Sequence, residues 1–234
     1  MHRVMSTLRG GGLVSSSRAL SRSVITVHQT VGEKTVKLTL SQGDIFDVCA
    51  RNEVQAIVNP ANSRMMHGGG LARLIADAAG PMLYRLHEAE NHYCPEGEAV
   101  ATPSFGVKTK CPDTTHILHT VGPSDYSAPE KARQVELLAN CVNNTTRLAL
   151  KEDLTSLAFP AISTGIFGIS FETSAEGMLH GLSQFTQHFL AKDDEHHQKE
   201  VHVHFVLLKE RPDLTKFQQA LEQQVQRGVW QRCE

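Results

Sequence analysis

The chain has 234 residues, of which 40% are hydrophobic and 21% are charged, and its formal net charge at pH 7 is −2. This length suits one domain with a sizeable core. The near-neutral charge excludes a broad basic surface, so we expect no nucleic-acid and no membrane partner. Five cysteines without C-x-x-C spacing argue against a disulfide framework and a zinc site. We therefore expect an intracellular protein with reduced thiols and with no metal or other cofactor.

The first 23 residues differ in composition from the rest of the chain. They contain four arginines and six serines but no lysine, aspartate or glutamate. This composition is typical of a mitochondrial transit peptide, and a disordered leader without an address is the alternative. We expect residues 1–23 to lie outside the fold and residues 24–234 to form a single domain. The protein is then mitochondrial, or otherwise cytoplasmic or nuclear.

Two β-rich runs, 24–28 and 35–40, open the domain and are joined by a turn at 31–34. The second run ends in Gly43-Asp44. An acid at this place is typical of a helix N-cap, and a ligand contact is the alternative. We expect Asp44 to cap the short segment that follows.

The stretch 54–79 contains a strand, a polar loop and a helix start within 26 residues. Its apolar run at 54–58 predicts a buried strand. The helix after the loop has an apolar stripe formed by Leu71, Leu74, Ile75 and Ala78. Three glycines, 68–70, stand where this helix begins, and the free N–H groups of a helix start suit an anion such as phosphate. A mobile glycine linker is the alternative.

Strands and helices alternate through the remainder of the chain. Further strands are expected near 99–105, 115–121, 157–161 and 201–208, and further helices from Pro81, over 129–151, after 168 and from Pro212. A second glycine-bearing loop, 162–168, follows the strand at 157–161. The order strand, glycine loop, helix thus occurs twice. This pattern predicts an α/β fold with its ligand site at the carboxyl ends of the strands.

Five motifs in register resemble the macrodomain family. They are GDI at 43–45, AIVNPAN at 56–62, GGGLA at 68–72, HTVGP at 119–123 and FPAISTGIFG at 159–168. The resemblance implies a three-layer α/β/α sandwich with a mixed, mostly parallel central sheet. It also implies ADP-ribose, free or on an ADP-ribosylated protein, as the partner. We expect a monomer.

The resemblance assigns ligand-binding roles within these motifs. Asp44, beside Ile45, would accept a hydrogen bond from the adenine amine, and Leu208 would cover the base. Asn62 would bind the hydroxyls of the distal ribose, with Asn59 shaping the same loop. Two backbone cradles would hold the pyrophosphate. The first comprises Gly68, Gly69, Gly70, Leu71 and Ala72, and the second comprises Ser163, Thr164, Gly165, Ile166, Phe167 and Gly168.

The activity implied is hydrolysis of ADP-ribosyl esters, either mono-ADP-ribose on acidic side chains or O-acetyl-ADP-ribose. Catalysis would depend on positioning of a water and of the distal ribose by Asn62, Gly69, Gly70 and Phe167. In macrodomains of the MacroD type, an aspartate linked to the reaction stands where this chain has Ala72, and a histidine stands at Ala76. The chain is closer to the branch with Gly-Gly-Gly-Leu-Ala, some members of which only bind. A non-catalytic ADP-ribose reader module is therefore the alternative.

Overall fold

The computed structural model describes residues 22–90, 93–191, 198–208 and 213–233. The expected leader therefore lies outside the described residues, except for its last two positions. The first strand already begins at Arg22, two residues before the expected start of the fold. No described helix combines the length and the apolar character that crossing a membrane requires.

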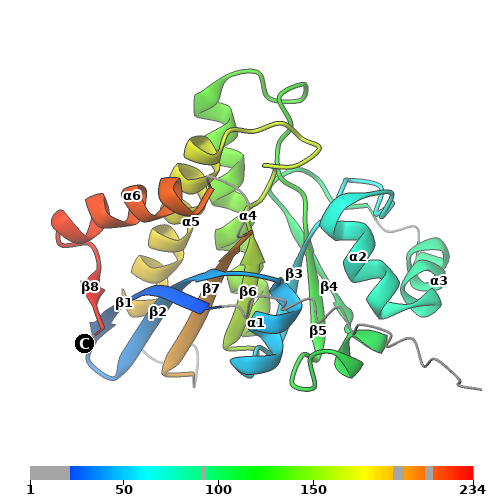
Figure 1. Cartoon of the computed structure of the whole chain (residues 1–234), viewed down its shortest axis with the longest axis horizontal. Coiled ribbons are helices and arrows are strands. Elements are labelled where there is room, and N and C mark those ends of the chain that lie inside the picture. Colours follow the sequence, from blue (N-terminus) through cyan, green and yellow to red (C-terminus); the bar gives the residue numbers. More distant parts are fainter. Residues whose placement is uncertain (1–21, 91–92, 192–197, 209–212, 234) are drawn as a thin grey trace, which may run out of the picture.

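The middle layer is a mixed sheet (Figure 1). Its strands are β1 (Arg22–Val31), β2 (Lys34–Gln42), β3 (Ala56–Pro60), β4 (Ala99–Pro103), β5 (His116–Thr120), β6 (Ser156–Pro160), β7 (Glu200–Leu207) and β8 (Gln231–Arg232). Their order is β4-β5-β3-β6-β7-β2-β1-β8. The strands from β5 to β2 run parallel, whereas β4, β1 and β8 are antiparallel to their neighbours. This arrangement confirms the predicted mixed, mostly parallel sheet.

Helices cover both faces of the sheet, which confirms the predicted α/β/α sandwich (Figure 1). One face carries α4 (Lys131–Lys151), α5 (Phe171–Ala191) and α6 (Asp213–Gln226). The other carries α1 (Ile45–Arg51), α2 (Gly70–Ala79), α3 (Pro81–Glu90) and the 3₁₀ helix η1 (Phe105–Thr109). The larger core lies on the first face and includes the fully buried Phe159 and Phe205. A smaller core around Ile57 and Ile75 lies on the second face.

The long helices pack closely because α5 carries glycines toward α4. A Cβ atom at Gly181 would lie 2.2 Å from the carbonyl oxygen of Ala139 in α4. The expected apolar stripe of α5 is confirmed, since Ala175, Met178 and Phe185 are all buried.

Two local expectations needed correction. Leu74 was expected on the buried stripe of α2 but is 59% exposed, because the helix buries Ile75 together with Ala76 and Ala79 instead. The short strand β8 was not expected at all; it follows Trp230, which is buried.

Candidate functional site

The predicted ligand residues follow the carboxyl ends of four strands that are neighbours in the sheet, β3, β6, β7 and β2. The loop with Asn62 leaves β3, and the second glycine loop leaves β6. Leu208 follows β7 directly, and Asp44 lies two residues after β2. Neighbouring strands lie about 4.8 Å apart, so the four ends span roughly 14 Å. This width suits an elongated ligand of several parts rather than a single phosphate.

The first glycine loop leads into the N-terminus of α2, as predicted. Gly69 is the N-cap residue, and the first helical hydrogen bond runs from the N–H of Arg73 to the carbonyl of Gly69, at 3.3 Å. The N–H groups of Gly70, Leu71 and Ala72 precede that bond, so the helix does not use them. Gly70 has φ +58°, a conformation that favours glycine. This end of the helix can therefore offer several N–H groups to an anion.

The second glycine loop is a compact turn closed by its own backbone. The N–H of Gly168 donates to the carbonyl of Gly165, and the N–H of Ile169 donates to the carbonyl of Ser163, both at 3.1 Å. Ser163 has φ +64°, which is unusual for a residue with a side chain. The N–H of Asp125 donates to the carbonyl of Phe167 at 3.1 Å. Sequence reasoning did not single out Asp125, which supports this loop from a different part of the chain.

The HTVGP motif makes room for this turn. A Cβ atom at Gly122 would lie 2.2 Å from the hydroxyl oxygen of Ser163, so only glycine fits there. This residue follows β5, which lies two strands from β6 in the sheet. The glycine of the motif therefore acts through close packing against the second loop.

Ile166 brings the two glycine loops together. Its side chain is 81% exposed. Its Cδ1 atom lies 3.2 Å from the place of a Cβ atom on Gly69 and 3.9 Å from that on Gly70. The expected juxtaposition of the loops is therefore present in the fold, although the part that each residue plays toward a ligand stays a prediction.

The proposed adenine end lies at β2 and β7. The N–H of Gly43 donates to the carbonyl of Leu207 at 2.9 Å, which places Asp44 beside the end of β7. The Asp44 carboxylate accepts from the N–H of Phe46 at 2.8 Å, so its expected role as the N-cap of α1 is confirmed. Ile45 is buried, whereas Leu208 is 53% exposed. Leu208 thus presents apolar surface where a base face could rest.

The family model described as Macro domain matches residues 58–178, slightly more than half of the chain. The chain belongs to the macrodomain family. The matched region contains both glycine loops and runs from β3 into α5.

Several named proteins resemble this macrodomain over about two thirds of its length. A macro domain-containing protein of Listeria monocytogenes is 37% identical over 65% of this chain and 82% of its own length. The ADP-ribose glycohydrolase MACROD1 of Bos taurus is 36% identical over 68% of this chain, but the match covers only 45% of that protein. The O-acetyl-ADP-ribose deacetylase of Salmonella typhimurium is 36% identical over 64% of this chain and 80% of its own length.

Solved structures agree on the fold. The Oceanobacillus iheyensis macrodomain with ADP has a TM-score of 0.68 and 30% identity, covering 88% of this macrodomain and 98% of that chain. The Trypanosoma brucei macrodomain in complex with ADP-ribose has a TM-score of 0.62 and 26% identity, covering 79% and 68%. Neither likeness assigns this macrodomain to the Gly-Gly-Gly-Leu-Ala branch, which stays a prediction.

In this macrodomain the amide of Asn62 organises its own loop. The Asn62 Oδ1 atom accepts from the N–H groups of Arg64 and Met66, each at 3.1 Å, and its Nδ2 donates to the carbonyl of Met66. The second hydrogen of Nδ2 takes no part in these bonds, and its predicted contact with a ribose hydroxyl stays a prediction. Asn62 is thus first a positioning residue for the loop, a role that sequence reasoning missed.

Asn59 lies beneath the first glycine loop among histidines. Its side chain is fully buried, and its Nδ2 atom lies 2.9 Å from Nδ1 of His119 and 3.4 Å from Nδ1 of His67. Asn59 thus contacts His67, the residue just before the first glycine loop, and its predicted part in shaping that loop and in ligand binding stays a prediction. Burial lowers the pKa of His67, so the ring stays neutral at pH 7. Sequence reasoning gave these histidines no role of their own.

Proposed function

We propose that this macrodomain binds ADP-ribose and hydrolyses ADP-ribosyl esters, with mono-ADP-ribose on acidic side chains or O-acetyl-ADP-ribose as substrate. The observation that carries the proposal is the approach of Ile166 to Gly69, which sets the two backbone loops face to face. Relatives named ADP-ribose glycohydrolase and O-acetyl-ADP-ribose deacetylase support the same chemistry. Solved neighbours with ADP or ADP-ribose support the ligand class.

The pyrophosphate lies between the two loops in this proposal. The N–H groups at the start of α2 and those of residues 163–168 donate to its oxygens, and these dipoles are already oriented before the ligand arrives. The distal ribose then reaches Asn62 on one side and Phe167 on the other. Adenine lies at the ends of β2 and β7, between Asp44 and Leu208.

The hydrolytic step requires a water near the anomeric carbon of the distal ribose. Ala72, in the first turn of α2, has no group that could take a proton from it. Water is instead positioned by the loop around Asn62 and by a phosphate oxygen of the substrate, while Phe167 fixes the sugar. We expect such a site to lose rate rather than affinity, compared with one that has a carboxylate base.

Calorimetry with free ADP-ribose tests the binding part of the proposal. We expect saturable heat with one ligand per chain. ADP should also bind, because it retains the base, one ribose and the two phosphates. Absence of saturable heat at high micromolar ADP-ribose would overturn the binding proposal and the hydrolase proposal together.

Release of ADP-ribose from a mono-ADP-ribosylated carrier protein tests turnover. A reader module is the second candidate, favoured by Ala72 and by the buried Ala76, which cannot act as acid or base. Binding without release of ADP-ribose or of acetate from O-acetyl-ADP-ribose would select the reader. Release at a rate proportional to enzyme concentration would select the hydrolase.

We also propose a monomeric, intracellular protein that residues 1–23 direct to mitochondria. The four arginines and the absence of acids in that segment support the address. A fluorescent fusion of the full chain should then colocalise with mitochondria, and deletion of residues 1–21, which leaves β1 intact, should make it diffuse. A diffuse signal from the full chain would rule out the organelle address, and sedimentation would check the monomer.

A further inference from the structure

We propose that His67, His87 and His119 form a binding site for one divalent transition-metal ion, best suited to zinc, beneath the first glycine loop. The three side chains come from the loop before α2, from α3 and from β5. All are buried, and their candidate ligand nitrogens lie within 4.8 Å of one another. Within the described ranges, this is the one such group of three. The inference does not rest on the proposed hydrolase activity.

The ring geometry is close to that of a three-histidine zinc site. The ring centroid of His87 lies 5.1 Å from that of His67 and 5.1 Å from that of His119. The centroids of His67 and His119 are 5.6 Å apart. Zinc with Zn–N distances of about 2.0 Å needs tetrahedral ligand nitrogens about 3.4 Å apart. A pair of nitrogens at the 4.8 Å limit must therefore close by roughly 1.4 Å at most, which side-chain rotation can supply. Three imidazoles leave the fourth position for a water.

Asn59 supplies the outer partner that metal-bound histidines require. Its amide faces the Nδ1 atoms of His67 and His119, while its own Oδ1 atom is buried and has no hydrogen-bond partner among the described residues. Amide oxygen and nitrogen are assigned from such contacts and can be exchanged. With the amide turned over, this oxygen accepts from both Nδ1–H groups, which leaves the two Nε2 lone pairs for an ion. Such an arrangement orients metal-bound histidines.

The hydrogen bonds of the Nε2 atoms indicate that the ion would displace the hydroxyl of Thr102. The buried Nε2 atom of His67 has no hydrogen-bond partner among the described residues. Nε2 of His119 lies 2.9 Å from the hydroxyl oxygen of Thr102, and this bond gives way to the metal.

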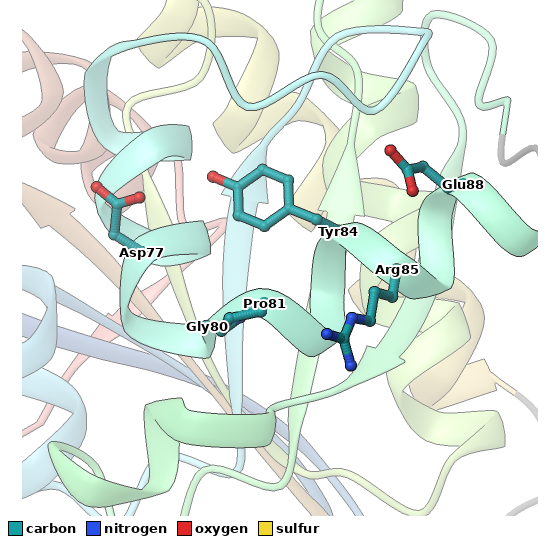
Figure 2. Close-up of a pocket in the computed structure, with 6 residues that line it drawn as sticks. All are labelled: Asp77, Gly80, Pro81, Tyr84, Arg85 and Glu88. Carbon is teal, nitrogen blue, oxygen red and sulfur yellow. The ribbon is translucent and has the colours of Figure 1, made fainter.

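A surface hollow lies beside Tyr84, the ring that packs against His67 (Figure 2). It has a volume of about 410 Å³ and lies between α2 and α3, lined by Asp77, Gly80, Pro81, Tyr84, Arg85 and Glu88. Figure 2 shows the Tyr84 ring reaching from α3 across this space. The same ring packs edge-on against His67, with centroids 5.9 Å apart. Tyr84 thus lines the hollow and contacts His67, so the proposal implies entry of the ion past this side chain.

The decisive experiment is titration of the chelator-treated full chain with Co²⁺, followed by visible absorption and calorimetry. We expect one ion per chain, a spectrum typical of tetrahedral nitrogen coordination, and displacement of Co²⁺ by Zn²⁺. His87→Leu removes one ligand without adding charge, and it should weaken binding at least 10-fold. Asn59→Leu should weaken it by about 10- to 100-fold through the lost outer partner.

His204→Leu is the matched control, because it also replaces a buried histidine but lies on β7, away from the cluster. It should retain the Co²⁺ spectrum and the stoichiometry. His67→Gln is the second ligand variant, in case His87→Leu does not fold, as judged by circular dichroism. The proposal is overturned if the unchanged chain gives no saturable spectrum, or if a folded ligand variant binds Co²⁺ as tightly as the unchanged chain does.

Discussion

The Cδ1 atom of Ile166 lies 3.2 Å from the point where Gly69 would carry a Cβ atom. Gly69 has φ −169°, an extended conformation open to any residue, so a side chain there meets the opposite loop rather than backbone strain. Gly69→Val should therefore fill the space between the loops. We expect ADP-ribose affinity to fall about tenfold or more, or 1.4 kcal/mol, with thermal stability nearly unchanged.

The double variant Gly69→Val, Ile166→Ala is its control, because the second change returns space to the gap. Calorimetry should show part of the affinity regained. Equal affinity in the unchanged chain and in Gly69→Val would mean that no ligand passes between these loops.

Loss of the Asn62 amide should disorder the loop that it holds. Asn62→Ala removes three hydrogen bonds to the backbone of Arg64 and Met66. Such bonds contribute about 0.5–1.5 kcal/mol each, and near the lower end when exposed. We expect ADP-ribose affinity and any turnover both to fall, each by about tenfold. A variant that lost turnover and kept full affinity would instead assign Asn62 a role only in the chemical step.

Leu208 offers a way to strengthen binding at the adenine end. The residue is 53% exposed and stands directly after β7. Leu208→Phe keeps the apolar contact and adds aromatic stacking, worth about 0.5–1.5 kcal/mol. Affinity for ADP-ribose should rise by roughly two- to tenfold in calorimetry. Affinity for ribose 5-phosphate, which lacks the base, should not change. A gain for both ligands would place the base elsewhere.

His204 should make the fold sensitive to acid. Burial, and then the charge of the adjacent His202, lowers the pKa of His204 to about 3 from an ordinary value of 6.5. Between these values the unfolded chain binds a proton that the folded chain does not, so stability falls as pH decreases, by up to about 1.4 kcal/mol per pH unit. Burial, and then the charge of Lys37 on β2, also lowers the pKa of His202, which adds to the effect.

Urea unfolding at pH 7 and pH 5 measures this dependence. His204→Leu should reduce the stability lost between the two pH values by about 1–2 kcal/mol. The exposed His180→Leu serves as the control and should leave the difference unchanged. The interpretation fails if His204→Leu loses as much stability at pH 5 as the unchanged chain.

Gly181 sets how closely α5 approaches α4. A Cβ atom there would lie 2.2 Å from the Ala139 carbonyl oxygen, and backbone cannot move aside as a side-chain end can. Gly181→Ala should destabilise the fold by roughly 1–3 kcal/mol, although alanine is the better helix former. Gln187→Ala, at an exposed position of the same helix, should be neutral or slightly stabilising. Thermal unfolding of both variants tests the contrast.

The features predicted correctly from sequence are those with local causes. Glycines 68–70 mark a helix start because the chain there needs a residue without a Cβ atom, and Gly70 indeed has positive φ. The apolar run at 54–58 predicted β3, which extends from Ala56 through Asn59 to Pro60. The sequence also predicted the Asp44 N-cap, because this cap depends on a local contact. The Asp44 carboxylate accepts a hydrogen bond from the N–H of Phe46, two residues away.

The features that were missed depend on contacts between distant segments. His67, His87 and His119 are too far apart in the chain to form a spacing motif, and only the fold brings their rings together. Leu74 matches the helical period as well as Ile75 does, and tertiary packing alone decides which of them is buried. The sequence also did not indicate that the Asn62 amide would form hydrogen bonds with the backbone of Arg64 and Met66.

The two-residue strand β8 closes the sheet on the side remote from the glycine loops. It pairs Gln231 and Arg232 with His28 and Val27 on the ten-residue strand β1. An unpaired edge strand of that length offers its free N–H and carbonyl groups to a strand of another molecule. The segment after Trp230 thus covers the middle of β1, from Thr26 to His28. We expect a form shortened before this segment to expose these positions to β-strand addition, far from the ligand site.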